Sequence, residues 1–150
     1  MARFLDYELI KNAFWADDDG NIFRRTTGKI ATHNHGKYLR VWFNNRKYYA
    51  HHIIWYFAHN EWPSHIDHKD GNTKNNRLSN LRKCTMSQNI ANANYGKLRG
   101  VEFHGNRARV RFQVNGVRVE LGSYKTVEEA IEVAKAGYEK YFGEFAFHRR

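Results

Sequence analysis

The segment from residue 65 to 92 gathers side chains that suit the hydrolysis of a phosphodiester bond. Asp67 and His68 end a short apolar run, and Asn80 and Asn89 follow them. Carboxylate and carboxamide oxygens are the ligands that a hard cation such as Mg²⁺ prefers, with water and a substrate phosphate completing its coordination. Asp67 and Asn89 are therefore candidate metal ligands. A metal held there would stabilise charge on the phosphate oxygens and on the leaving 3′ oxygen.

His68 is the candidate general base of this group. The unperturbed pKa of a histidine is about 6.5, so a neutral imidazole is available near neutral pH to take a proton from water. Asn80 is expected to hold one nitrogen of the ring and thereby fix the tautomer in which the other nitrogen accepts a proton. An Asp-His pair alone is common on protein surfaces, and it is the two carboxamides and the intervening loop that favour catalysis.

A strand, a loop, a second strand and a helix must bring these groups together. Residues 66–68 and 81–84 predict the two strands, and residues 70–79 are too polar and too rich in glycine and asparagine to form an element. A capping-box pattern predicts a helix that begins at Thr85, which places Asn89 about one turn inside it. The loop also contains asparagines that we interpret as turn-forming residues only: Asn72, Asn75 and Asn76.

The residues before this segment predict a small mixed fold. Short helices are expected from about Asp6 to Phe14 and over 51–60, and alternation of apolar residues predicts a hairpin over 36–50. Residues 17–21 predict a plain turn, because an EF-hand loop would need other ligands around these aspartates. His33 and His35 are placed in a solvated loop. The large aromatic residues are assigned to cores, among them Trp42, Trp55, Tyr138 and Phe142.

Residues 99–150 predict a second module of three strands and one helix. Apolar residues alternate along 108–114 and 117–121, and Asn115-Gly116 between them is typical of a type I′ hairpin turn. Thr126 opens a second capping box, followed by apolar residues at helical spacing. A polar, glycine-containing stretch over 92–100 marks the division, so we expect an α+β chain with modules at 1–94 and 99–150.

Arginines on the second module are candidate DNA ligands. Arg107, Arg109 and Arg111 alternate along one strand and should lie on one face, about 6.6 Å apart by the rise of a strand. Arg118 is expected to join them from the neighbouring strand. A row of cations on a basic protein suits contacts with DNA phosphates.

Composition supports a nucleic-acid partner. The 150 residues include 25 Lys and Arg against 15 Asp and Glu, which gives a net charge of +10, and the pI is near 9.8. A hydrophobic content of 41% argues against general disorder. The single cysteine, Cys84, excludes an intrachain disulfide and Cys-rich zinc modules. We expect no membrane segment, no secretory signal and therefore a cytoplasmic protein.

Histidines raise one alternative, a zinc pair formed by His65 and His68. Its H-x-x-H spacing suits zinc only on a helix, whereas the predicted strand would put the two rings on opposite faces.

The catalytic segment resembles the ββα-metal motif of HNH endonucleases, also called the His-Me finger, in the H-N-N variant of phage and intron homing enzymes. The stretches that carry the resemblance are His51–Trp55, Asn60–Pro63, Ile66–His68, Asn76–Arg82 and Asn89, within residues 36–94. The resemblance implies that Asp67 and Asn89 bind the metal and that His68 is the general base. It implies that Asn80 braces the loop and orients that base. His51 matches a histidine to which we give a structural role.

The second module resembles the APETALA/ethylene-response DNA-binding domain, which lays a three-stranded sheet in the major groove. The resemblance rests on Gly100-Val101, Asn115-Gly116, Leu121–Tyr124 and Thr126–Ala130. This module lacks the tryptophan that the family carries near its second strand, so phosphate contacts are expected rather than the plant type of base contact.

These observations predict a DNA endonuclease of the homing type that uses one Mg²⁺ or Mn²⁺ ion per active site. Its partner is double-stranded DNA, and one site per chain predicts nicking by a monomer or weak dimer. The resemblance implies a phage-encoded enzyme in a bacterial cytoplasm. Two alternatives remain: a DNA-binding protein that keeps the HNH frame without activity, and a transcription regulator driven by the second module.

Overall fold

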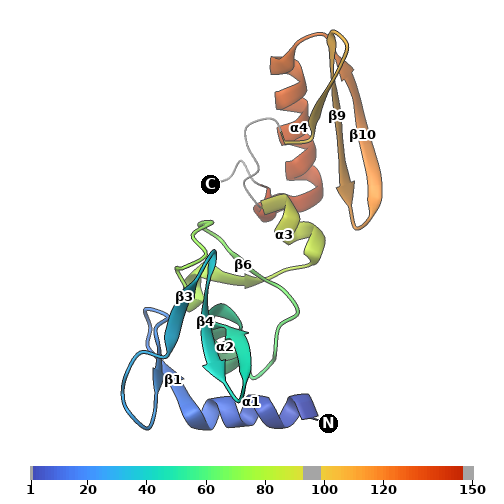
Figure 1. Ribbon diagram of the computed structural model, residues 1–150. Helices are drawn as coiled ribbons and strands as arrows, with labels where there is room; N and C mark the ends of the chain where they lie inside the picture. The colour runs from blue at the N-terminus through green and yellow to red at the C-terminus, as the bar shows by residue number, and fades with distance from the viewer. Residues whose placement is uncertain (1, 93–98, 147–150) are drawn as a thin grey trace. The chain divides into compact units, whose positions relative to one another are not determined.

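The computed structural model describes residues 2–92 and 99–146, which fall into two compact units, Met1–Lys83 and Cys84–Arg150. Each unit combines helices with antiparallel sheets, as expected of an α+β chain (Figure 1). Across the described residues, no helix has both the length and the apolar character needed to span a membrane.

The first unit is built from three small antiparallel sheets and two helices. Its elements are α1 (Ala2–Ala13), β1 (Phe14–Ala16), β2 (Ile22–Arg24), β3 (Thr32–His35), β4 (Tyr38–Phe43), β5 (Arg46–Tyr49), α2 (Ala50–His59), β6 (Ile66–His68), the 3₁₀ turn η1 (Leu78–Asn80) and β7 (Leu81–Lys83). The sheets pair β1 with β2, β3 with β4 and β5, and β6 with β7. Apolar side chains of α1, β1, β4 and α2 form one core, in which Ile10, Phe14, Val41 and Ile53 are fully buried.

Local sequence signals explain several of these elements. Asn44 and Asn45 both adopt positive φ, which a type I′ turn requires and asparagine tolerates, so the hairpin predicted over 36–50 is confirmed. The helix predicted over 51–60 is confirmed as α2, and Asn60 ends it in the left-handed conformation.

Other parts of the first unit differ from the sequence prediction. His33 and His35 belong to β3 and not to a loop, because residues 32–35 pair with β4. The predicted turn at 17–21 is present, with Asp17 accepting a hydrogen bond from the Asn21 amide at 2.8 Å, but it joins two strands that the sequence did not predict. Trp42, assigned to a core, is 46% exposed.

The β1–β2 turn fits tightly against the loop between β6 and η1. Gly20 has φ +80°, and a Cβ atom at this position would lie 2.3 Å from the backbone carbon of Asn76. Beside this contact, Arg77 donates to the Asp19 carboxylate at 2.6 Å. A residue with a side chain could not occupy position 20 without moving the loop that follows His68.

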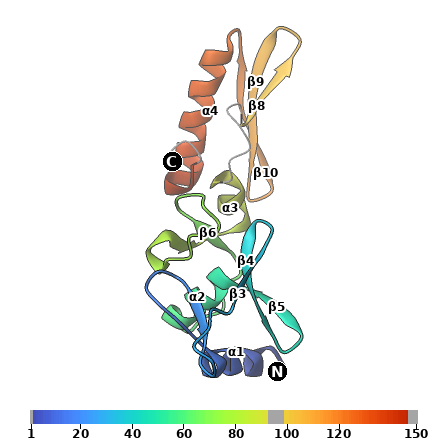
Figure 2. The same ribbon diagram turned by 60° about the vertical axis from the view of Figure 1, so that its left-hand side comes forward.

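The second unit is a three-stranded sheet covered by one long helix, preceded by a short one. Its elements are α3 (Met86–Asn92), β8 (Val101–His104), β9 (Arg107–Val114), β10 (Val117–Tyr124), α4 (Val127–Phe142) and the 3₁₀ turn η2 (Gly143–Phe145). The strand order is β10-β9-β8, and Figure 2 shows α4 lying along the sheet. The Asn115-Gly116 turn and the Thr126 cap of α4 are both as predicted; the Thr126 hydroxyl accepts from the Glu129 amide at 3.2 Å.

The compact units divide between Lys83 and Cys84, ahead of α3, whereas the sequence placed the break over 92–100. The reason is packing: Ala91 of α3 is buried in one cluster with Phe112, Tyr138 and Phe142 of the second unit. Residues 93–98, where the limits of the two predicted modules fall, lie outside the described residues.

Substituting Gly20 should destabilise the first unit more than substituting a glycine in open space. Gly20→Ala is expected to lower the free energy of unfolding by about 2–5 kcal/mol, from positive φ and from the overlap with Asn76. Gly28→Ala is the control: Gly28 has φ +66° with nothing within 4 Å, and it should cost only about 1–2 kcal/mol. Urea unfolding followed by tryptophan fluorescence measures this, since Trp15, Trp42, Trp55 and Trp62 all lie in the first unit. Equal losses in the two variants would contradict the packing argument.

Candidate active site

The antiparallel pair β6–β7 positions the two residues at the centre of the predicted site. Asp67 lies opposite Arg82 in the register and His68 lies opposite Leu81. Asp67 and His68 are buried, at 5% and 4% exposure. The two strands were predicted from the sequence, and both are confirmed.

Asp67 is oriented by a charge across the strand pair. The Nε and one terminal nitrogen of Arg82 both lie 2.8 Å from Oδ2 of Asp67. Both side chains are largely buried, at 6% and 11% exposure. The two contacts from Arg82 hold the Asp67 carboxylate in place. The positive charge of Arg82 also compensates the buried negative charge of Asp67, which would be costly without a partner.

The ring of His68 is held by Asn76. Nε2 of His68 lies 3.1 Å from the Asn76 side-chain oxygen, and Asn76 is only 1% exposed. A carboxamide oxygen can only accept, so the proton of a neutral ring lies on Nε2 and the lone pair on Nδ1. Burial lowers the pKa of His68, while the Asn76 hydrogen bond and the carboxylates of Asp67 and Asp70 act in the opposite direction. The imidazole is therefore neutral near neutral pH, as a general base must be.

Asn80 braces the loop, and the hydrogen bond to the His68 ring comes from Asn76 instead. The side-chain nitrogen of Asn80 donates to the Asp70 carboxylate at 2.9 Å and to the backbone carbonyl of Asn75 at 2.8 Å. The side-chain oxygen of Asn80 accepts from the backbone N–H of Asp70 at 3.1 Å. These bonds fix the loop that follows His68. Burial raises the pKa of Asp70, but hydrogen bonds from the side chains of Asn75 and Asn80 and from the Asn72 amide together hold it below its usual value.

Asn76 belongs to the candidate site although the sequence predicts only a turn-forming role for it. The neighbouring Asn75 does bind within the loop, donating to Asp70 at 2.7 Å. Nothing in the local sequence distinguishes Asn76 from Asn75, and only its burial beneath Gly20 sets it apart.

Asn89 lies where the sequence placed it on its helix. The capping box is complete, because the Thr85 amide donates to Gln88 at 2.8 Å and the Gln88 amide donates to the Thr85 hydroxyl at 3.2 Å. Helix α3 begins at Met86, so Asn89 lies in its first turn. Asn89 belongs to the second unit and Asp67 to the first. Their pairing as metal ligands therefore stays a prediction.

The available ligands suit a cation that binds few protein groups. Within residues 2–92 and 99–146, no three His, Cys, Asp or Glu side chains gather into a metal-binding group. Asp67 and Asn89 offer hard oxygen atoms, and Mg²⁺ typically takes one or two such protein ligands together with water and phosphate. Carboxylate and carboxamide oxygens of this kind suit Mg²⁺ or Mn²⁺ better than zinc, which favours His and Cys ligands.

His51 packs edge-on against the proposed base, with ring centres 5.0 Å apart. Burial, followed by the neighbouring His52 and His68, lowers the pKa of His51 to about 2. Its Nδ1 is buried and has no hydrogen-bond partner among the described residues. His51 is thus a neutral ring that supports His68 by packing.

The four predicted arginines of the second unit lie on the sheet face opposite α4. Ala108, Val110 and Phe112 alternate with them and are buried, and Arg118 pairs with Gln113 in the register. Three of the arginines have partners on the same face: Arg107 binds Ser123, Arg109 lies 3.5 Å from Glu120 and Arg111 pairs with Glu102. The Arg111 guanidinium lowers the pKa of Glu102. Carboxylates therefore offset part of this positive surface.

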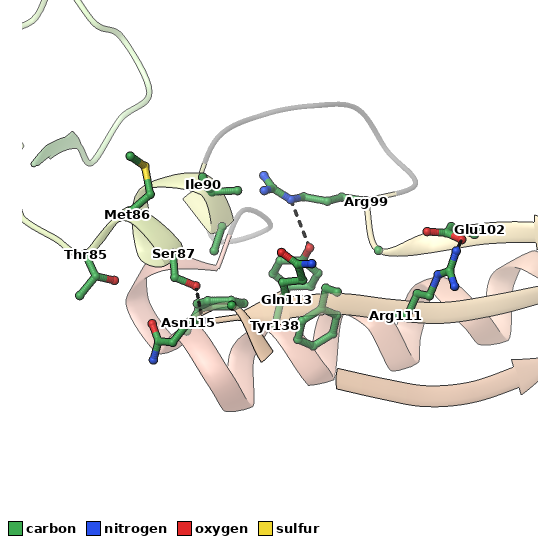
Figure 3. Close-up of a pocket in the computed structure, with 15 residues that line it drawn as sticks. Thr85, Met86, Ser87, Ile90, Arg99, Glu102, Arg111, Gln113, Asn115 and Tyr138 are labelled. Atoms are coloured by element: carbon green, nitrogen blue, oxygen red, sulfur yellow. Dashed lines mark hydrogen bonds and ion pairs between the residues drawn. The ribbon is translucent and has the colours of Figure 1, made fainter. Parts of the chain in front are cut away.

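A pocket of about 620 Å³ lies between α3 and the sheet of the second unit (Figure 3). Its floor is aromatic, and the hydroxyl of Tyr138 accepts from Arg99 at 3.2 Å. Among the described lining residues the carboxylate is that of Glu102, which Arg111 already binds. This lining offers no histidine beside a carboxylate, so the pocket does not suit hydrolysis by the chemistry of His68.

Comparisons with known proteins support the type of domain that the sequence predicts. Residues 48–91 match the family model described as HNH endonuclease. This segment is similar to an HNH endonuclease domain. It contains all four residues of the predicted catalytic and metal-binding set: Asp67, His68, Asn80 and Asn89. The sequence prediction of such a domain is thus confirmed, and the family match ends before the second sheet.

A protein of Acanthamoeba polyphaga mimivirus named "Uncharacterized HNH endonuclease L560" is 34% identical over 84 residues. The aligned part covers 55% of this chain and 45% of that relative, so the chain spans less than half of its length. No solved structure matches the chain.

The burial of His51 predicts a pH dependence of stability. Because the pKa of His51 is lowered from 6.5 to about 2, the unfolded chain binds a proton below pH ~6.5 that the folded state does not. Stability is therefore greatest above that pH and falls as pH decreases, by up to about 1.4 kcal/mol per pH unit for one group. His51→Phe should flatten this slope between pH 6 and 4.5, measured by urea unfolding. His59→Ala, an exposed histidine of α2, should not. An unchanged slope in His51→Phe would refute a neutral buried ring.

Proposed function

We propose that the protein is a metal-dependent DNA endonuclease of the homing type that hydrolyses phosphodiester bonds. The observation that carries the proposal is the buried, neutral His68, held at Nε2 by Asn76 beside Asp67, within the segment that matches HNH endonucleases. This arrangement leaves the lone pair of Nδ1 to accept a proton, as a general base requires.

His68 acts as the general base in this mechanism. Nδ1 takes a proton from a water molecule as its oxygen attacks phosphorus, and the bond from phosphorus to the 3′ oxygen breaks. The leaving 3′ oxygen takes a proton from solvent water, so the products are a 5′-phosphate and a 3′-hydroxyl. Asn76 keeps the ring in the accepting tautomer, and Asn80 holds the loop so that His68 and Asp67 keep their places.

Asp67 and Asn89 are the residues that would hold the metal. When bound, one Mg²⁺ or Mn²⁺ ion would supply positive charge next to the phosphate oxygens and the leaving oxygen. Arg82 orients Asp67 for this role through its two bonds to Oδ2. The capping box of Thr85 and Gln88 fixes the helix that carries Asn89.

The second unit is proposed to bind double-stranded DNA through Arg107, Arg109, Arg111 and Arg118. Their position on one open face and the net charge of +10 support this role, as does the resemblance to the APETALA/ethylene-response domain.

One active site per chain supports nicking by a monomer or weak dimer. A phage-encoded enzyme in a bacterial cytoplasm is part of the proposal; the relative from a giant virus supports a viral origin only.

The alternative is a DNA-binding protein or transcription regulator that keeps the HNH frame without cutting. It predicts ordinary DNA binding with no cleavage in any metal. The tautomer of His68 set by Asn76 and the capping box at the start of the helix that carries Asn89 favour the nuclease.

A supercoiled-plasmid assay tests the proposal. With Mg²⁺ or Mn²⁺ the wild type should convert supercoiled to nicked DNA, and EDTA should stop the reaction. His68→Ala is expected to lose about 10²–10⁴-fold in rate, which is the usual contribution of a general base, and Asn89→Ala should also lose activity. His59→Ala, an exposed histidine of α2, is the matched control and should cut normally. Cleavage that survives His68→Ala would rule out this mechanism, and DNA binding without cleavage in either metal would favour the alternative.

A further inference from the structure

The first unit has a long stretch without acidic residues. From Gly20 to Asn60 the sequence contains no Asp or Glu. Over the same stretch it contains these cationic residues: Arg24, Arg25, Lys29, Lys37, Arg40, Arg46 and Lys47. This stretch includes the whole β3–β4–β5 sheet, so the sheet itself supplies cationic side chains and no acidic ones.

The register divides this sheet into a core face and an open face. Val41 and Tyr48 pair with each other and are buried against the core. Residues alternate along a strand, so Arg40 and Trp42 of β4 lie on the other face. The register pairs Arg40 with Tyr49 and Trp42 with Lys47.

The open face carries cations stacked on exposed aromatic rings. The Arg40 guanidinium lies 4.8 Å from the centre of the Tyr49 ring, and the Lys47 ammonium lies 5.5 Å from that of Trp42. Trp42 is 46% exposed and Tyr49 is 37% exposed. Large aromatic rings left in solvent beside cations mark a binding surface rather than a core.

The same face continues into the candidate active site. Tyr38 of β4 lies 5.5 Å from Tyr49 and 6.3 Å from His68 between ring centres. Tyr49 in turn stacks on His51 at 5.3 Å. The turn before β4 is tied to the catalytic loop, because the Thr73 hydroxyl donates to the carbonyl of Lys37. Ring contacts through Tyr49 and Tyr38 thus link the open face to the proposed base.

We propose that the open face of β3–β4–β5 binds the DNA duplex directly beside the phosphate that is cut. Arg40 and Lys47 contact backbone phosphates, and the ring of Trp42 packs on the neighbouring deoxyribose. The cationic side chains of the sheet favour a polyanionic ligand. Because the face adjoins His68, that ligand is the nucleic acid whose phosphodiester bond is hydrolysed there. This inference rests on the proposed function, and it gives the catalytic unit a DNA surface of its own.

Binding of the full-length protein to a fluorescein-labelled 30-bp DNA duplex in EDTA tests this surface without cleavage. Lys47→Ala and Arg40→Ala should each weaken binding severalfold near 0.1 M salt. Each should also reduce the slope of log K against log salt by about 0.9, the value for one lost phosphate contact. Lys140→Ala removes an exposed lysine from α4 and should change neither quantity. The DNA affinity of Arg118→Ala measures separately the contribution of the sheet of the second unit to binding.

Tryptophan fluorescence locates the contact on the sheet. DNA should quench the emission of the wild type, and Trp42→Phe should lose most of that quenching, because Trp42 is the ring placed at the contact. Circular dichroism of each variant checks that it is folded. A same-length RNA duplex serves as competitor and should compete less well than DNA.

The outcomes separate this inference from the proposed activity. If Lys47→Ala, Arg40→Ala and Trp42→Phe behave like Lys140→Ala while the wild type nicks plasmid, the surface is wrong and the nuclease stands. If they weaken binding and quenching while the wild type cuts nothing, the surface stands and the nuclease is wrong. Stronger competition by RNA would overturn the choice of DNA.

Discussion

The candidate site depends on one buried hydrogen bond, between Nε2 of His68 and the side-chain oxygen of Asn76. A buried imidazole without a partner could take either tautomer, and only one of them presents the lone pair of Nδ1 to a water molecule. Asn76 can hold the ring only if its own backbone is fixed. A segment remote in the sequence supplies this constraint. The β1–β2 turn brings Gly20 against the backbone carbonyl group of Asn76 so closely that a Cβ atom on residue 20 would have no room.

The remaining parts of the first unit support this bond from other sides. Asn80 and Asp70 close the loop on itself, so the backbone on both sides of Asn76 is anchored. His51 covers the His68 ring and stays neutral because it is buried. Arg82 holds the neighbouring carboxylate from the opposite strand. Each contact is individually modest, yet together they fix the ring of the proposed base and the carboxylate proposed to bind the metal before any substrate arrives.

Much of the fold followed from local signals in the sequence. The capping box of α3, the Asn44-Asn45 and Asn115-Gly116 turns and the strands around Asp67 depend on neighbouring residues, so they could be predicted. The β1–β2 hairpin was not predicted, because the helical spacing over residues 6–14 includes Phe14, the first residue of β1, and no recognisable motif marks the strand pair. The role of Asn76 was hidden for a deeper reason: it depends on contact with Gly20, which is remote in the sequence. The packing of Ala91, which assigns α3 to the second unit, is likewise a tertiary effect.

The most direct measurement is the tautomer of His68 in the metal-free, ¹⁵N-labelled protein at neutral pH, read from long-range proton–nitrogen correlations. The account predicts one tautomer, with the proton on Nε2 and the lone pair on Nδ1. Asn76→Ala should give a mixture of the two, and Asn75→Ala, which leaves the bond to the ring intact, should keep the wild-type pattern. A wild-type protein with its proton on Nδ1 would contradict the central claim, because Asn76 would then not set the base.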